Sequence, residues 1–205
     1  MLLISSTPRK TIVILFAVYI IIMNTAYCTT ITITPGQKIQ EAIDSALPGD
    51  IIQVIGGIYF ENLVISKNLI LKGINDPLID AQANGSAIII LADRSTIIGF
   101  NVTNSSDSGI EIRSNDNFIS NNTAANGHDG MVLDAASNNT VLGNIFRENQ
   151  KSGICLEKSN NNTLRDNRAE NNYDTGIEIE DSANNYIFRN IAVNNSNDGI
   201  QFPNI

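Results

Sequence analysis

The chain has few groups suited to covalent cross-linking, soft-metal binding or nucleic-acid binding. Its 205 residues include two cysteines and one histidine, and its 13 lysines and arginines are outnumbered by 21 aspartates and glutamates. Cys28 falls at the end of a leader-like segment, so Cys155 is left without a partner and no intrachain disulfide is expected. The excess of negative charge argues against nucleic acid as a partner.

The first 28 residues have the pattern of a secretory signal peptide. Arg9 and Lys10 precede the apolar run 12–23, after which the pattern Ala26, Tyr27, Cys28 suggests a cleavage site. The run has twelve residues, whereas about 20 are needed to cross a bilayer, so no stable membrane span is expected after cleavage. Removing residues 1–28 takes away two basic residues and no acidic one, giving a net charge of 11 − 21 = −10. We therefore expect a secreted or cell-surface protein.

The dominant feature of the remaining chain is an internal repeat. A glycine followed by an apolar, alternating triplet recurs at spacings of 21, 23, 23 and 23 residues, and each unit contains short apolar alternations bounded by Asn, Gly, Ser and Asp. Such alternations predict strands, and a unit of two or three strands without a helix predicts one coil of a parallel β-helix. The repeated glycines are Gly109, Gly130, Gly153, Gly176 and Gly199.

Stacking of the coils explains why identical residues recur in register, since neighbouring coils lie about 4.8 Å apart. We expect the asparagines to form hydrogen-bonded columns and to occupy the corners of the coils. The three expected asparagine columns are Asn117, Asn139, Asn162 and Asn185; Asn122, Asn144, Asn167 and Asn190; and Asn149, Asn172 and Asn195. The residues expected to point inward are Ile110, Ile112, Met131, Leu133, Ile154, Leu156, Ile177, Ile179, Ile200 and Phe202, with Ile119, Val141, Leu164 and Ile187 as a second wall.

The two ends of the solenoid are expected to differ. Residues 29–50 predict a strand and a short helix, with Ile39, Ala42, Ile43 and Ala46 at helical spacing, that caps the open core. Residues 51–205 predict the coils, which become regular from about residue 96. The sequence stops at Ile205 directly after the fifth glycine strand. We therefore expect a truncated product, or a C-terminal coil that pairs with another chain or continues in a longer product.

The phrase "IQEAIDSALPGDIIQVIGGIYFENLVISKNLILKGIN", followed by units of the form "GIxIxxSxxNxhxxNxxxxN", resembles the right-handed parallel β-helix proteins of the pectate-lyase-like superfamily. It is similar to repeats of carbohydrate-binding proteins and sugar hydrolases, of NosD-type periplasmic copper-accessory proteins and of archaeal cell-surface proteins. The resemblance covers roughly residues 31–205. It implies an all-β, right-handed solenoid of about 23 residues per coil, whose ligands bind on the outward face of the glycine strand.

That outward face carries two predicted columns, of which the second stacks three carboxylates. Carboxylates about 5 Å apart repel unless a cation, a base or water screens them. The cluster therefore suggests a calcium site at Asp134, Glu157 and Glu180, or an acid/base pair for glycoside hydrolysis, against the simpler interpretation of a solvated acidic surface. The first column is Glu111, Val132, Cys155, Glu178 and Gln201, and the second is Arg113, Asp134, Glu157, Glu180 and Pro203.

Few other residues suggest chemistry. His128 lies in "NGHDG", which resembles the Gly-His-Gly phrase of polygalacturonases only loosely, and is expected to be a turn residue. Cys155 is either a reactive thiol or a small residue in an outward stack. His128, Met131 and Cys155 are too few for a copper site. Seven sequons are candidate glycosylation sites: Asn84, Asn101, Asn104, Asn121, Asn138, Asn161 and Asn194.

The sequence favours a binding or structural role without catalysis, directed at carbohydrate or envelope polymers and without a cofactor unless calcium binds. The first alternative is a polysaccharide lyase, hydrolase or epimerase acting on the acidic face. For that alternative, the catalytic candidates are His128, Asp134, Glu157, Glu178 and Glu180, and the ligand-binding face would also include Glu111 and Arg113. The second alternative is a NosD-like accessory protein for copper-enzyme assembly.

Overall fold

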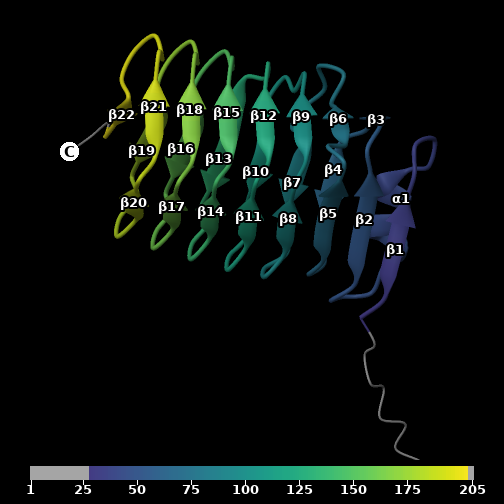
Figure 1. Cartoon of the computed structure of the whole chain (residues 1–205). Coiled ribbons are helices and arrows are strands. Elements are labelled where there is room, and N and C mark those ends of the chain that lie inside the picture. Colours follow the sequence, from purple (N-terminus) through teal and green to yellow (C-terminus); the bar gives the residue numbers. More distant parts are fainter. Residues whose placement is uncertain (1–27, 203–205) are drawn as a thin grey trace, which may run out of the picture.

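The computed structural model describes residues 28–202, which form a right-handed parallel β-helix of about eight turns. Each turn has about 22 residues, one fewer than the repeat spacing suggests, because the early coils are irregular. Figure 1 shows the coils side by side from the N-terminal helix to the C-terminal coil. The expected fold class is confirmed, with three parallel sheets along the length of the solenoid.

The first sheet, which we call the eight-stranded sheet, consists of β1 (Thr30–Ile33), β2 (Ile51–Ile55), β5 (Ile70–Ile74), β8 (Thr96–Ile98), β11 (Phe118–Ser120), β14 (Thr140–Leu142), β17 (Thr163–Arg165) and β20 (Tyr186–Phe188). The second, the side sheet, consists of β3 (Ile58–Phe60), β6 (Leu78–Asp80), β9 (Asn101–Thr103), β12 (Thr123–Ala125), β15 (Ile145–Arg147), β18 (Arg168–Glu170) and β21 (Ile191–Val193). The third, the glycine sheet, consists of β4 (Leu63–Ile65), β7 (Ile88–Ile90), β10 (Ser108–Ile112), β13 (Asp129–Asp134), β16 (Ile154–Glu157), β19 (Ile177–Glu180) and β22 (Ile200–Gln201).

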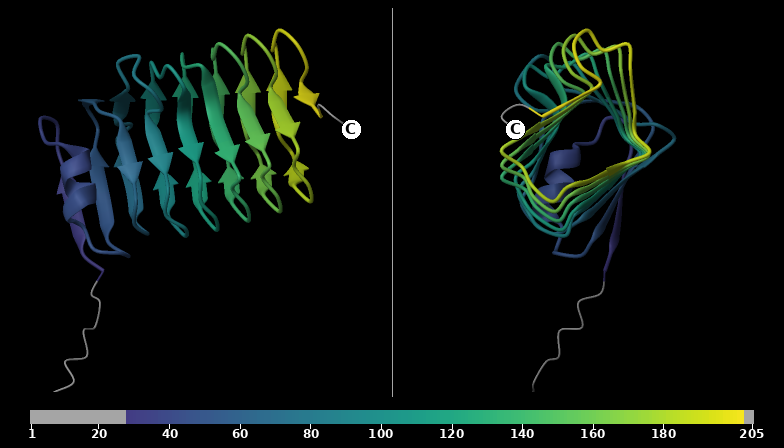
Figure 2. Two further views of the ribbon diagram at one scale, coloured as in Figure 1. Left: turned by 180° about the vertical axis from the view of Figure 1, so that it is seen from behind. Right: turned by 90° about the vertical axis from the view of Figure 1, so that its left-hand side faces the viewer.

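The core is the shared interior of these sheets, around which the coils superpose when viewed end-on (Figure 2). The expected inward residues of the glycine sheet and the eight-stranded sheet are buried from Ile110 to Ile179, and Ile187 packs partly buried against them. The side sheet supplies a third wall that the repeat did not reveal, including Val102, Ala124 and Phe146. Its strands follow the second asparagine column, and the middle residue of each triplet points inward.

The N-terminal end of the core is covered by the expected helix, α1 (Ile39–Ser45). Its apolar residues Ile39, Ala42 and Ile43 are buried against β1, β2 and β4. The carboxylate of Glu61 accepts hydrogen bonds from the backbone N–H groups of Ile39 (2.9 Å) and Gln40 (3.1 Å). Those groups have no partner within a helix, so Glu61 caps the helix from a neighbouring coil.

All three asparagine columns form the expected hydrogen-bonded ladders. In each step, an amide oxygen accepts a hydrogen bond from the backbone N–H of the asparagine one coil earlier, and in most steps also from its side-chain amide; the bonds from Asn117 to Asn139 are both 2.9 Å. The side-chain amides of Asn139 and Asn162 bond instead to Ser114 O and Ala136 O. The prediction that these asparagines also adopt the left-handed corner conformation is wrong. That conformation belongs to the residue directly before each ladder asparagine, as in Asn121 (φ 54°) and Asn138 (φ 59°). One residue therefore forms the corner of the backbone, and the asparagine that follows it forms the hydrogen bonds of the ladder.

The corner residues include several glycosylation candidates. Asn121, Asn138, Asn161 and Asn194 each precede a ladder asparagine and are exposed, as are Asn84 and Asn104. Asn101 is half-buried in β9. The side chains that a glycan would modify are thus accessible at six of the seven sequons, while the ladder asparagines from Asn117 to Asn172 are buried.

The last described coil is more open than the others. Ile200 and Phe202 were expected to point inward, but they are 43% and 50% exposed because no later coil within residues 28–202 covers them. The expected signal peptide, apart from Cys28, lies outside the described residues, as does Pro203. Within residues 28–202, no helix is long and apolar enough to cross a membrane.

Candidate functional site

The outer face of the glycine sheet holds the two predicted columns in register. Strand pairing aligns Glu111, Val132, Cys155, Glu178 and Gln201 in the first column. It aligns Asp134, Glu157 and Glu180 in the second column. Arg113 Nε lies 3.9 Å from Asp134 Oδ2. The sequence therefore placed these side chains correctly on the outside of the coil.

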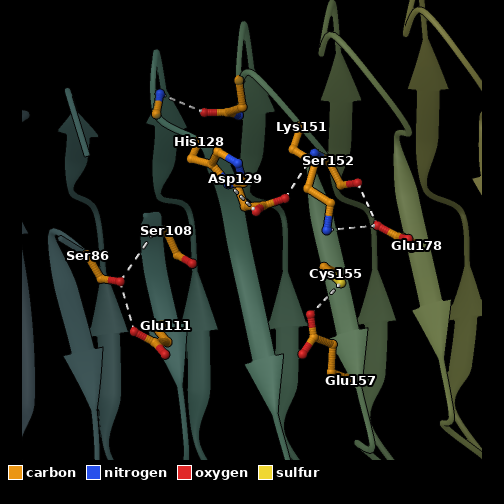
Figure 3. Close-up of polar contacts among 12 residues, drawn as sticks. Ser86, Ser108, Glu111, His128, Asp129, Lys151, Ser152, Cys155, Glu157 and Glu178 are labelled. Atoms are coloured by element: carbon orange, nitrogen blue, oxygen red, sulfur yellow. Dashed lines mark hydrogen bonds and ion pairs between the residues drawn. The ribbon is translucent and has the colours of Figure 1, made fainter. Parts of the chain in front are cut away.

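The first column is much less open than its outward direction suggests. Glu111 is only 5% exposed, and its Oε2 accepts a hydrogen bond of 2.8 Å from Ser86 Oγ on the preceding coil. The same arrangement recurs where Ser152 Oγ donates to Glu178 Oε2 (2.9 Å). We call this set of bonds the hydroxyl–carboxyl ladder (Figure 3). Glu111, expected on an open binding face, is instead buried, with its carboxylate bonded to Ser86 and paired with Arg113.

The hydroxyl residue of each rung lies two residues before the first inward residue of its strand: Ser86 before Ile88 of β7 and Ser152 before Ile154 of β16. The aligned residues of the other coils, Ser108, Asp129 and Thr175, each directly precede a repeated glycine. Thr175 and Gln201 continue the pattern, since Thr175 Oγ1 lies 3.1 Å from Gln201 Oε1. The aligned hydroxyl residues were visible in the sequence, but the burial that makes them bond to the first column was not.

The ladder is interrupted in the middle coils. Val132 and Cys155 occupy positions where Glu111 and Glu178 accept bonds, and Asp129 replaces a hydroxyl residue. Asp129 is buried, with one oxygen bonded to the Ser152 N–H (2.9 Å) and the other to His128 Nδ1 (2.8 Å). His128 is therefore tied to its turn, as expected, while its side chain stays 47% exposed.

Two cations near the face, Arg113 and Lys151, form ion pairs with carboxylates of the first column. Arg113 Nη2 lies 2.5 Å from Glu111 Oε1, and Lys151 Nζ lies 3.7 Å from Glu178 Oε2. Burial lowers the pKa of Lys151, but the negative charges of Asp129 and Glu178 outweigh it, so the pKa is raised overall. Lys151 therefore remains protonated at neutral pH and is a poor general base.

Cys155 is covered, which contradicts a reactive thiol. It is 1% exposed, and burial, followed by the charge of Glu178, raises its pKa far above the ordinary value of 9.0. In the unfolded chain the thiol ionises near pH 9, whereas the folded thiol keeps its proton, so the stability that Cys155 contributes is complete below pH 9 and declines above it.

We expect a maleimide at pH 7 to label Cys155 about 100-fold more slowly, or slower still, in the folded chain than in denaturant, because the thiolate is the reactive species. Mass spectrometry of time points gives both rates. A Cys28→Ser chain isolates the signal of Cys155. Equal rates in the folded and unfolded states would contradict the burial seen here.

The second column contains the least committed acidic groups of the face. Asp134, Glu157 and Glu180 are half-buried, and Glu157 and Glu180 line a small hollow of about 100 Å³ with Lys158 and Asp181. Within residues 28–202, no group of three histidine, cysteine, aspartate or glutamate side chains is gathered so that it could hold a metal ion. The calcium hypothesis and the copper alternative therefore gain no support from this part of the chain.

Repulsion along the second column should be measurable. We expect Glu157→Gln to stabilise the protein by about 0.5 kcal/mol, since like charges in paired positions of adjacent strands destabilise a sheet.

We also expect calcium to leave the Tm of the unmodified chain unchanged, as a ligand that does not bind the native state has no effect on it. Thermal unfolding with calcium and with a chelator tests both; a rise in Tm with calcium that Glu157→Gln abolishes would restore the metal site.

Comparisons with known proteins agree with this architecture. The family described as "Right handed beta helix region" matches residues 56–204. A search of the curated proteins gave no match to the sequence. Among solved structures, a pectate lyase is similar with a TM-score of 0.66 and 16% identity. The matched region covers 75% of this chain and 53% of the pectate lyase chain. A mutant of a periplasmic alginate epimerase is similar with a TM-score of 0.59 and 22% identity. The matched region covers 83% of this chain and 43% of the epimerase chain. This chain thus spans about half the length of these structures, and the likeness concerns the fold.

Proposed function

Since the chain belongs to the right-handed beta helix family, we propose that it is a binding module that holds a carbohydrate or envelope polymer along the outside of the coil without cleaving it. The observation that carries this proposal is the commitment of the first-column carboxylates, of Asp129 and of the two nearby cations to structural contacts. Glu111, Asp129 and Glu178 each accept hydrogen bonds from neighbouring coils or turns. Groups fixed in this way are poorly placed to exchange protons with a substrate.

The fold supports a polymer ligand for a geometric reason. A solenoid presents equivalent side chains at a regular spacing of about 4.8 Å over an extended surface, which suits a ligand that is itself linear and repetitive. Proteins named for pectate and alginate share this fold. The signal-peptide pattern, and the periplasmic location stated for the alginate epimerase, support an exported product.

The uncommitted carboxylates of the second column favour one alternative, a polysaccharide lyase, hydrolase or epimerase. In this alternative Asp134, Glu157 and Glu180 would supply the acid and base, and His128 would approach from the neighbouring turn. A hydrolase needs two carboxyl groups on either side of the scissile bond, whereas these three are stacked along one face. That stacking makes the binding role the stronger proposal.

Binding and catalysis can be separated with one preparation of the purified chain. We expect retention on at least one immobilised neutral or acidic polysaccharide, with no reducing ends, unsaturated products or change in uronate configuration after prolonged incubation. Heat-unfolded protein is the control for nonspecific adsorption. Product formation that is lost in Asp134→Asn, Glu157→Gln or Glu180→Gln would replace the binding role by the enzymatic one, and failure to bind any polysaccharide would refute the proposal.

A further inference from the structure

A second face of the coil carries a hollow that the outward columns do not include. It lies on the outer surface of the side sheet over β6, β9, β12 and β15, and it has a volume of about 390 Å³. Pockets that bind small organic ligands commonly measure about 300–1,000 Å³. The hollow is therefore large enough for a sugar residue.

The hollow exists because one position in a stacked column is small. Strand pairing aligns Thr103 with Ala125 and Ala125 with Arg147, so an alanine methyl group lies between two longer side chains on adjacent coils. Leu78 adds an apolar side chain at the other edge. The result is an apolar floor with longer polar side chains around it.

The rim of the hollow is made of polar side chains without internal partners. Asn101, Thr103, Thr123 and Asn126 line it, and none of their side chains takes part in a hydrogen bond within residues 28–202. The ladder asparagines behave in the opposite way, since Asn122 in the same coil donates its amide to Ile97 O and Asn144 Oδ1. The rim groups are therefore free to bond the hydroxyl groups of a ligand.

One cation also faces the hollow. Arg147 lines it and contacts the exposed Glu148 through a single nitrogen, with Nη1 3.0 Å from Glu148 Oε2. A guanidinium has five N–H donors and binds carboxylates with two parallel hydrogen bonds, so most of its donors remain available. Asp76 supplies an acceptor from the turn before β6.

We propose that this hollow binds one acidic sugar residue of the polymer, with its carboxylate on Arg147. The ring hydroxyls bond Asn101, Thr103, Thr123 and Asn126, and the apolar face of the ring lies over Ala125 and Leu78. The inference rests on the proposed binding function and assigns it a subsite on the side sheet, away from the acidic columns of the glycine sheet. It also names the ligand class as a uronic-acid saccharide.

The test compares a trimer of galacturonic acid with a trimer of galactose by isothermal titration calorimetry on the whole chain. We expect the acidic trimer to bind more tightly, and Arg147→Gln to weaken it about tenfold or more while changing the neutral trimer little. Ala125→Leu fills the hollow and should abolish binding of both. Thr123→Val removes one hydroxyl at constant size and should weaken both, and it is informative even if the leucine variant fails to fold.

Arg168→Gln is the matched control, since Arg168 lies on β18 of the same sheet, outside the hollow, where it pairs with Glu170. It should bind both trimers as the unmodified chain does. Polysaccharide binding that survives Arg147→Gln, Thr123→Val and Ala125→Leu unchanged would place the ligand elsewhere and overturn the subsite alone. Equal affinity for both trimers would overturn the acidic ligand class. No binding to any saccharide would remove the proposed function together with the subsite.

Discussion

Asn144→Ala is expected to lower the free energy of unfolding by about 3–5 kcal/mol. The side chain of Asn144 is buried, and its Oδ1 accepts from the backbone N–H (2.9 Å) and side-chain amide (3.1 Å) of Asn122. Its Nδ2 donates to Ile119 O and Asn167 Oδ1, both at 3.0 Å. Each buried group left without a partner costs about 1–3 kcal/mol, and the bonds lie in a continuous network. Urea unfolding followed by circular dichroism gives the value.

Asn161→Gly is the control for this substitution. Asn161 is exposed and adopts the left-handed conformation (φ 57°), which glycine tolerates without strain. The change in stability should therefore stay within about 0.5 kcal/mol. A similar loss in both variants would show that asparagine content, and not the position in the ladder, determines stability.

Gly153→Ala is expected to destabilise the protein by about 2–3 kcal/mol or prevent the coils from stacking. A Cβ atom at this position would lie 2.7 Å from the carbonyl oxygen of Gly176, 2.8 Å from Ala169 Cβ and 2.9 Å from Asn172 Nδ2. Two of these neighbours belong to the backbone or to a short side chain, so they cannot move aside, and overpacking of this kind costs about 1–3 kcal/mol. The glycine column thus reflects close approach between coils.

The last glycine of the same column provides the comparison. At Gly199, an added Cβ would meet Ala192 Cβ at 3.6 Å, which is ordinary van der Waals contact. Gly199→Ala should therefore change the unfolding midpoint little. If both variants are equally unstable, the requirement for glycine must come from backbone conformation, and the explanation by stacking fails.

Repetition made the architecture predictable from the sequence. Because every coil meets the same neighbours, the same residue types are required at the same positions, and the inward columns and asparagine ladders could be read directly. The side sheet was harder to recognise, since its inward residues include Ala124 and Ala169, which are small enough to pass for turn residues. The corner conformation was assigned to the wrong asparagine because both members of a pair such as Asn121 and Asn122 are suited to it.

For the candidate site, the sequence predicted only which side chains point out of the coil. Alternation placed Glu111 and Cys155 outward, but it does not report how far neighbouring side chains bury an outward residue, and both side chains are buried. The hydroxyl–carboxyl ladder joins residues 25 or 26 positions apart, a distance that the spacing of the glycines alone did not suggest. The hollow on the side sheet depends on a single alanine, Ala125, whose effect appears only when the coils are stacked.

The parallel pairing of each strand with the same strand of the next coil has a consequence for how such a protein can change. Contacts join each coil to its immediate neighbours, so a whole unit added within the regular part finds every partner that its neighbours already use. A fractional unit would shift each ladder out of register. The length of the outer surface can therefore grow in whole-coil steps of about 4.8 Å, and under the proposed binding function the length of polymer in contact with one molecule would grow with it.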